Sequence, residues 1–238
     1  AYPSLLYNAM VNPLVGLSMQ GVIWYQGENN TNRAKEYYHL FPAMINDWRK
    51  KWGKDFPFYW VQLANYMDVV EVPSESLWAQ VREAQTQTLS LSHTGQAVII
   101  DIGEAKDIHP KNKQEVGRRL ALHALHNDYG FSDVVCESPM PKTVRRVQDK
   151  IVVQFDNVAD GLIVKNKYGY LMSFAVAGND GVYKWVQAKV AGKDRVVLSC
   201  PDVIDPVSVR YAWGDNPDDA NLYNSVGLPA TPFEIKVE

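Results

Sequence analysis

The 238-residue sequence lacks the features that mark nucleic-acid-binding and membrane proteins. Its net charge is only −3, and its basic residues form no cluster. A protein that binds nucleic acid or a lipid surface electrostatically needs such a cluster. No apolar run approaches the roughly 20 residues of a membrane-spanning helix. We therefore expect no nucleic-acid partner and no insertion into a membrane.

Cysteine is scarce, and several common motifs are absent. Cys136 and Cys200 are the only cysteines; the sequence does not fix their separation, so one disulfide stays open, but we expect two buried thiols. There is no Gly-x-Gly-x-x-Gly, P-loop or Cys-x-x-Cys stretch. His123 and His126 lie near each other without a carboxylate or cysteine set at metal-ligand spacing. The sequence thus predicts neither a nucleotide site nor a metal site.

What is present in the first half is an alternation of apolar runs and amphipathic segments. A hydrophobic fraction of 46% and a charged fraction of 21% are ordinary for a globular protein. The predicted buried strands span 21–25, 56–65 and 96–103, and the predicted helices span 34–52, 77–91 and 112–130. This order is typical of a parallel sheet with helices packed on it. We expect an α/β domain over residues 1–138.

Local signals refine the helix boundaries. Pro42 is expected to kink or divide the first helix, and Gly53 to end it. Asn112 is a predicted N-cap with Glu115 as its capping-box residue, and Gly130 is the predicted end of that helix.

The second half has a different character. Short β-rich runs separated by turn signals lie at 151–155, 161–164, 174–177, 183–188, 195–199 and 208–213. Many short strands at this spacing indicate a β-sandwich. We place this domain at residues 139–238, with the boundary near Pro139 and Pro141.

A polar turn follows the first apolar run. Gln26, Gly27, Glu28 and Asn29 come directly after a β-branched and aromatic stretch. Open α/β sheets bind ligands at this edge, and a glycine lets the backbone approach closely. Gln26, Asn29 and backbone N–H groups are donors suited to an oxygen that gains negative charge. The alternative is a strand end with a polar turn and no chemistry.

A histidine follows the third apolar run. His109 stands two residues after Asp107 and directly before Pro110, which favours an extended backbone at His109. A histidine with a neighbouring carboxylate is the base and its orienting acid in acyl transfer; the alternative is a surface loop before a helix. Since both segments follow strands of one predicted sheet, we expect loops 26–29 and 107–109 to face a common cleft.

Four longer stretches carry a family resemblance. They are Trp24-Tyr25-Gln26-Gly27-Glu28-Asn29-Asn30, Val81-Arg82-Glu83-Ala84-Gln85, Asp107-Ile108-His109-Pro110-Lys111-Asn112-Lys113 and Arg210-Tyr211-Ala212-Trp213-Gly214-Asp215-Asn216-Pro217. Segments 220–224 and 227–233 match as well. In this order they resemble the sialate O-acetylesterase family, within the SGNH hydrolases. The resemblance implies part of an SGNH-type three-layer domain followed by a β-sandwich.

The resemblance also implies a chemistry. It implies a serine esterase without metal or cofactor that removes acetyl groups from sugars, sialic acid in particular, with His109 as general base. Gln26, Gly27 and Asn29 correspond to the segment that supplies oxyanion-hole donors. Glu28 is expected to hold that loop in shape. Arg82 is grouped with these oxyanion and substrate-binding residues.

Two departures from the family pattern stand out. The family's nucleophile lies in a Gly-Gln-Ser-Asn-Met type motif, which is absent, as is the block that brings a glycine to the oxyanion hole. Ser18 stands in Gly-Leu-Ser-Met-Gln, which is not a nucleophile elbow. The wider superfamily places the supporting Asp three residues before the His, which is Lys106 here. Asp107 is the expected acid, with Glu104 and Asp101 as alternatives.

These departures shape the functional hypothesis. We expect the C-terminal part of an esterase for O-acetylated sialic acid, inactive alone because a missing N-terminal part would supply the serine. The alternatives are an acetylxylan esterase, or a non-catalytic carbohydrate-binding or structural module in which Trp185, Trp213 and Tyr223 pack or stack on sugars. The family resemblance implies a periplasmic or secreted location, although no signal peptide is visible.

Overall fold

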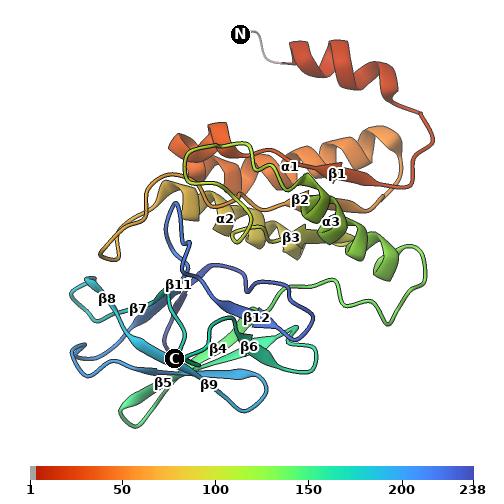
Figure 1. Cartoon of the computed structure of the whole chain (residues 1–238). Helices are drawn as coiled ribbons and strands as arrows, with labels where there is room; N and C mark the ends of the chain where they lie inside the picture. Colours follow the sequence, from red (N-terminus) through yellow and green to blue (C-terminus); the bar gives the residue numbers. More distant parts are fainter. Residues whose placement is uncertain (1–3) are drawn as a thin grey trace.

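The computed structural model describes residues 4–238, in which a helix-and-sheet unit precedes an all-β unit (Figure 1). The elements of the first unit are η1 (Tyr7–Val11), η2 (Asn12–Leu14), β1 (Val22–Trp24), η3 (Glu28–Arg33), α1 (Ala34–Trp52), β2 (Phe58–Val61), α2 (Leu77–Gln87), η4 (Thr88–Ser90), β3 (Thr94–Ala97) and α3 (Lys113–Asn127). The three strands form one parallel sheet in the order β1-β2-β3. The predicted α/β class is confirmed.

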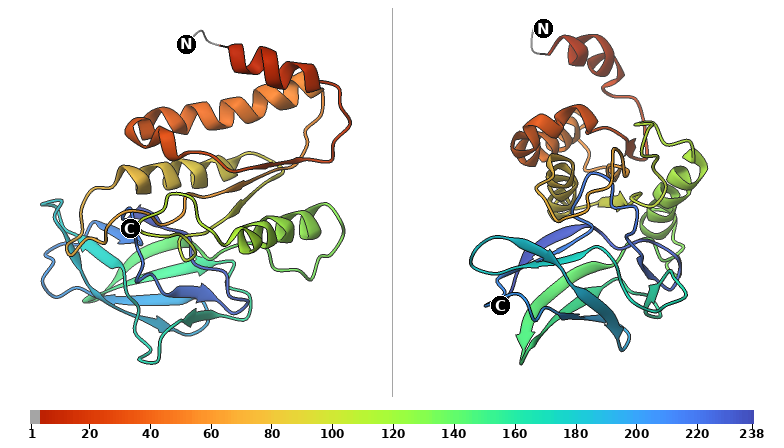
Figure 2. Two further views of the ribbon diagram at one scale, coloured as in Figure 1. Left: turned by 45° about the horizontal axis from the view of Figure 1, so that its top comes forward. Right: turned by 60° about the vertical axis from the view of Figure 1, so that its left-hand side comes forward.

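The central strand β2 is buried along its length because helices cover both of its faces. Alternate side chains of a strand point to opposite faces. Phe58 and Trp60 therefore pack with α1 and α2, while Tyr59 and Val61 pack with α3. The result is a three-layer arrangement with two helices on one face and one on the other (Figure 2).

The helix ends follow the local signals in part. Gly53 caps α1 in a left-handed conformation, and the Asn112 side chain accepts a hydrogen bond from the Glu115 N–H at 3.2 Å, both as predicted. Helix α1 continues through Pro42 without division, because the hydrogen-bond ladder resumes beyond it. Helix α3 ends at Asn127 rather than near Gly130.

Strand β1 is not the buried strand that the sequence predicted. It lies at the edge of the three-stranded sheet, and Ile23 is 71% exposed. Trp24, on the other face, packs against Trp48 of α1 with ring centroids 5.8 Å apart. Helix α3 packs on β2 and β3, so the side chain of Ile23 has no helix above it.

The third apolar run leaves the sheet earlier than predicted. Strand β3 ends at Ala97 instead of continuing to Gly103. Val98 and Ile100 then pack into the core of the second unit, whereas Ile99 packs beneath α3. The run after Gln96 is continuously apolar because its side chains contribute to the cores of both units.

The second unit contains two four-stranded antiparallel sheets, in the orders β4-β5-β10-β9 and β13-β11-β7-β8, and a β12-β6 pair. Its strands are β4 (Met140–Val147), β5 (Lys150–Asp156), β6 (Leu162–Val164), β7 (Phe174–Ala177), β8 (Tyr183–Trp185), β9 (Gln187–Ala191), β10 (Arg195–Ser199), β11 (Ser208–Tyr211), β12 (Leu222–Asn224) and β13 (Phe233–Lys236). The predicted sandwich is confirmed, but the run 183–188 divides into β8 and β9. Strands β4, β12 and β13 were not predicted from the sequence.

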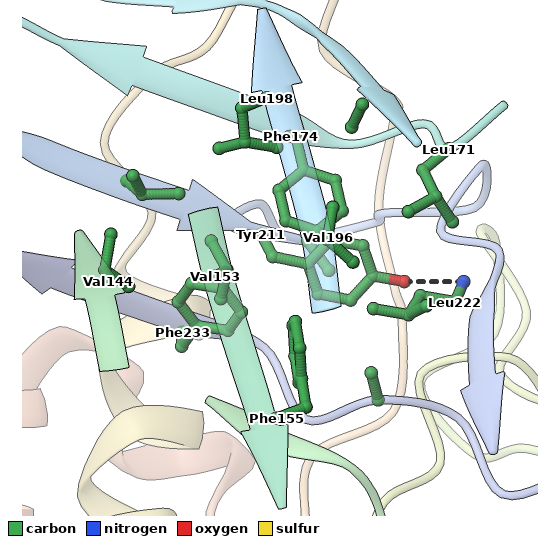
Figure 3. Close-up of a cluster of buried hydrophobic side chains, with 14 of the residues drawn as sticks. Val144, Val153, Phe155, Leu171, Phe174, Val196, Leu198, Tyr211, Leu222 and Phe233 are labelled. Atoms are coloured by element: carbon green, nitrogen blue, oxygen red, sulfur yellow. Dashed lines mark hydrogen bonds between the residues drawn. The ribbon is translucent and has the colours of Figure 1, made fainter. Parts of the chain in front are cut away.

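The sandwich core contains a buried tyrosine, Tyr211, that is hydrogen-bonded to the backbone of Leu222 (Figure 3). Tyr211 is fully buried, and its hydroxyl accepts a hydrogen bond from the Leu222 N–H at 3.0 Å. Burial raises the pKa of Tyr211, so the group stays protonated. Cys200 lies in this core, and both cysteines are buried free thiols, as expected. Within residues 4–238, no helix is both long and apolar enough to cross a membrane.

We expect Tyr211→Phe to lower the free energy of unfolding by about 1–3 kcal/mol, because it leaves the buried Leu222 N–H without an acceptor. Urea denaturation measures the loss. Tyr129→Phe, at an exposed position, is the matched control and should change stability by less than about 0.5 kcal/mol. Equal effects of the two variants would contradict a structural role for the Tyr211 hydroxyl.

Candidate active site

A cleft of about 320 Å³ opens where the turn after β1 meets the loop before α3. It is lined by Tyr25, Glu28, Ile108, His109 and Lys113. The first two follow β1, the next two lie in the loop after the third apolar run, and the last begins α3. The expectation that the two loops face a common cleft is confirmed.

His109 projects into this cleft with 86% of its side chain exposed. Asp107 shapes the loop beneath it, because its Oδ1 accepts the backbone N–H of His109 at 2.9 Å. An aspartate bound to the backbone two residues on makes the chain turn. The same oxygen lies 3.7 Å from His109 Nδ1, just beyond hydrogen-bond distance. Asp107 therefore borders the imidazole on the Nδ1 side.

The two alternative acids are engaged elsewhere. Both Asp101 oxygens accept from the Arg119 guanidinium, at 2.6 and 2.9 Å, and Tyr223 donates to the same carboxylate. Glu104 accepts from the Lys111 ammonium at 2.9 Å. Asp107 is thus the carboxylate that the structure places against His109.

Gln26 is not among the residues that line the cleft, and it is held on several sides. Its side-chain amide donates to Asn30 Oδ1 at 2.8 Å, and the Tyr37 hydroxyl donates to Gln26 Oε1 at 3.2 Å. The Gln85 amide donates to the backbone carbonyl of Gln26 at 3.3 Å. A side-chain amide carries two N–H groups, so one donor of Gln26 is left for a ligand. Asn29 is exposed in the same turn.

Gly27 is required by backbone conformation and by packing. Its φ of +152° is rarely adopted by other residues. A Cβ there would lie 3.1 Å from Leu63 Cδ2 and 3.2 Å from Gln85 Nε2. The glycine therefore lets the turn close on β2 and α2, which is a different reason from the close ligand approach that the sequence suggested.

Arg82 is placed away from the cleft, in contrast to its predicted grouping with substrate-binding residues. It is fully buried, and its guanidinium donates to the carbonyl oxygens of Leu63, Ala64, Gly214 and Asp215 at 2.6–3.0 Å. Burial lowers its pKa to about 9, opposed by the charge of Asp215. The group stays charged at neutral pH, and it fastens the segment after β2 to the sandwich loop 213–216.

Two cleft residues were not singled out from the sequence, although both stand in the stretches that carry the family resemblance. Tyr25 has a buried hydroxyl without a hydrogen-bond partner among residues 4–238. Burial and the charge of Glu28 raise its pKa to about 12, so it remains a donor. The Lys113 ammonium lies 4.6 Å from the centre of the Tyr25 ring and brings a positive charge to the cleft.

The other histidines do not contribute to this cleft. The ring of His123 is hydrogen-bonded to the carbonyl of Gln96, and the ring of His126 to the carbonyl of Val134. In the described part of the chain, no three His, Cys, Asp or Glu side chains gather as a metal site would require.

Comparison with known proteins adds the family. The profile of the family described as carbohydrate esterase, sialic acid-specific acetylesterase, matches residues 2–126. The chain belongs to this family. The sialate O-acetylesterases of Pongo abelii and Homo sapiens are each 31% identical to it over 258 aligned residues, covering 97% of this chain and 48% of theirs. The chain thus spans about half the length of these relatives.

A solved structure of a similar protein has the same fold. The crystal structure of a carbohydrate acetylesterase from Xanthomonas citri superimposes with a TM-score of 0.92 at 44% sequence identity. The match covers 99% of this chain and 54% of that one. Both units of this chain are therefore shared with a carbohydrate acetylesterase.

We expect Gly27→Ala to destabilise the protein by about 1–3 kcal/mol, because it forces a strained backbone and crowds Leu63. Gly117→Ala is the control, since a Cβ in that helix meets nothing within 4 Å; it should stabilise by about 0.5–1 kcal/mol. Denaturant unfolding of the pair measures both. Opposite signs are expected, and equal signs would contradict this explanation of Gly27.

Arg82→Lys should lower the free energy of unfolding by roughly 2–4 kcal/mol, because one ammonium cannot reach carbonyls that a planar guanidinium spans. The exposed Arg118→Lys, which keeps its pairing with Glu115, should cost less than about 0.5 kcal/mol. Chemical denaturation compares the two. A silent Arg82→Lys would show that the loops are held by other contacts.

Proposed function

We propose that this chain is the histidine-bearing part of a carbohydrate O-acetylesterase that acts on acetylated sialic acid. The observation that carries the proposal is the cleft in which His109, backed by Asp107, faces the turn after β1. Family membership gives the reaction class, the hydrolysis of acetyl esters on sugars.

The chemistry requires a nucleophile. A serine Oγ attacks the acetyl carbonyl carbon while His109 takes its proton, and donors of the 26–29 turn stabilise the oxyanion. Collapse breaks the ester C–O bond, and His109 returns the proton to the departing sugar hydroxyl. Water then attacks the acetyl-serine with the same base and releases acetate. Asp107 keeps the imidazole in the required orientation throughout.

We assign the nucleophilic serine to polypeptide outside residues 1–238. Within residues 4–238, the His109 ring has no hydrogen bond to a serine or threonine hydroxyl, and its nearest charged partner is Asp107. Strand β1 has a free edge with Ile23 exposed beside it. An exposed edge of this kind accepts a further strand, and a strand added there would bring new residues next to the 26–29 turn.

The cleft is lined by one acidic and one basic residue, Glu28 and Lys113, and its basic residue favours an acidic sugar. Lys113 supplies an ammonium beside His109 and Tyr25, and the carboxylate of a sialic acid is a suitable partner for it. The sialate O-acetylesterases among the relatives carry this substrate in their name. An acetylated xylan has no such carboxylate, so Lys113 separates the two candidate substrates.

Purified Ala1–Glu238 should hydrolyse an aryl acetate no faster than its His109→Ala variant, because the described residues offer no serine to His109. Initial rates of phenol release measure this. Robust turnover that depends on His109 would show that a serine of this chain is the nucleophile and would overturn the assignment to an outside segment.

In the longer protein that carries this chain, Asp107→Asn should lower kcat by about 10³–10⁴-fold with little change in thermal stability, because the imidazole is held in the wrong tautomer. Asp101→Asn is the matched control: it should act on stability, through Arg119. A silent Asp107→Asn together with a crippling Glu104→Gln would show that Glu104 is the orienting acid.

Lys113→Met should lower kcat/KM for an O-acetylated sialic acid by about tenfold, the effect of one lost charge-assisted contact. It should leave kcat/KM for an uncharged aryl acetate unchanged. Equal losses on both substrates, or faster turnover of acetylated xylan than of the sialic acid, would refute the acidic-sugar assignment.

A further inference from the structure

A second cavity is lined in part by the loop that follows β2. It has a volume of about 280 Å³ and shares no lining residue with the His109 cleft. Its walls come from the loop 69–71, the segment 171–174, the end of β8 and the loop 212–219. This volume is close to the lower limit for small-molecule sites, and it suits a single ring better than an extended ligand.

A buried donor without a partner lines this cavity. Trp213 is only 6% exposed, and its Nε1 has no hydrogen-bond acceptor within residues 4–238. Arg210 lies against the ring of Trp213, 4.9 Å from its centre, and is paired with Glu75 and Glu234. The Trp213 N–H has almost no exposed surface, so the residue contributes an apolar part of the cavity wall and its donor is not within reach of a ligand.

A second indole also lines the cavity. Trp185 is 43% exposed, and its Nε1 donates to the Glu71 carbonyl at 2.9 Å. This bond holds the 69–71 loop against the sandwich and fixes the ring. Val69 and Val70 extend the apolar wall. A rigid aromatic surface next to carboxylates matches a pyranose ring, which has an apolar C–H face and hydroxyls at its rim.

The charged groups of the cavity are acidic. Glu71 and Asp219 line it, and one Asp219 oxygen accepts from the Ser173 hydroxyl, which leaves the other oxygen for a ligand. Among the described lining residues there is no Lys, Arg or His. Carboxylates accept sugar hydroxyls well but repel an anionic sugar. The charged residues that line this cavity are thus both acidic, whereas the His109 cleft has Glu28 as well as Lys113.

We propose that this cavity binds one neutral pyranose unit, with the free Asp219 oxygen on one of its hydroxyls and Trp185 against its C–H face. The Asn216 side-chain amide on the cavity wall donates to the Met67 carbonyl at 2.7 Å, and the Met67 N–H donates to the Ala105 carbonyl at 3.0 Å. The cavity is thus joined by two hydrogen bonds to the loop that carries His109.

Binding to Ala1–Glu238 is measured by isothermal titration calorimetry with lactose, xylotetraose and cellotetraose, and with sialyllactose for comparison. We expect at least one neutral probe to bind saturably. Asp219→Asn should weaken it about fivefold, as for one lost charge-assisted hydrogen bond, and Trp185→Ala by at least as much. Trp52→Phe, whose indole bonds the distant Leu17 carbonyl, is the matched control and should bind like the unaltered chain.

A second readout needs no variant. In the NMR spectrum of the unaltered chain, the indole N–H resonances of Trp213 and Trp185 should shift on addition of the neutral probe, while that of Trp52 stays. No saturable binding of any neutral probe, tighter binding of the sialylated part of sialyllactose, or unshifted Trp213 and Trp185 resonances would overturn the proposal. Because no hydrolysis is involved, these outcomes are independent of the proposed esterase activity.

Discussion

The fully buried guanidinium of Arg82 is the contact on which the arrangement of the two units depends. Its donors bind carbonyls at the end of β2 and carbonyls of the sandwich loop 213–216. A buried charge is costly unless its hydrogen bonds are met, so both loops must adopt one geometry. The loops set by Arg82 include the residues that bond Met67 and, through it, the segment before His109.

A second polar network also connects the α/β unit to the sandwich, next to the segment that carries His109. Arg119 of α3 binds Asp101, and Tyr223 of the sandwich donates to the same carboxylate. The segment between Asp101 and α3, which carries Asp107 and His109, is therefore anchored at both ends. Asp101 is structural for this reason, and Asp107 is left free to turn the loop and border the imidazole. The sequence positions of Asp101 and Asp107 do not show which of the two acids supports His109, whereas their hydrogen-bond partners in the structure do.

The sequence predicted the parts of the fold whose signals are local. The period of Ala34, Phe41 and Ile45 and the left-handed Gly53 describe α1 correctly. The sequence failed where one segment serves two partners: Val98 and Ile100 read as a strand but pack into the sandwich core. The sequence also failed where the burial of a side chain depends on elements distant in the chain, as at Ile23, which no helix covers. At the site, the residue types of His109 and Asp107 were visible in sequence, but the burial of Arg82 and the cleft position of Lys113 required three dimensions.

The two concave sites differ in charge because they are built from different elements. The His109 cleft gains Lys113 from the start of α3, where Asn112 has capped the helix and directs the chain. The second cavity is built from sandwich loops and takes Glu71 and Asp219. Glu28 and Lys113 give the first site charges of both signs, whereas the charged residues that line the second are acidic. The loop 66–71 is held by the Trp185–Glu71 and Asn216–Met67 hydrogen bonds.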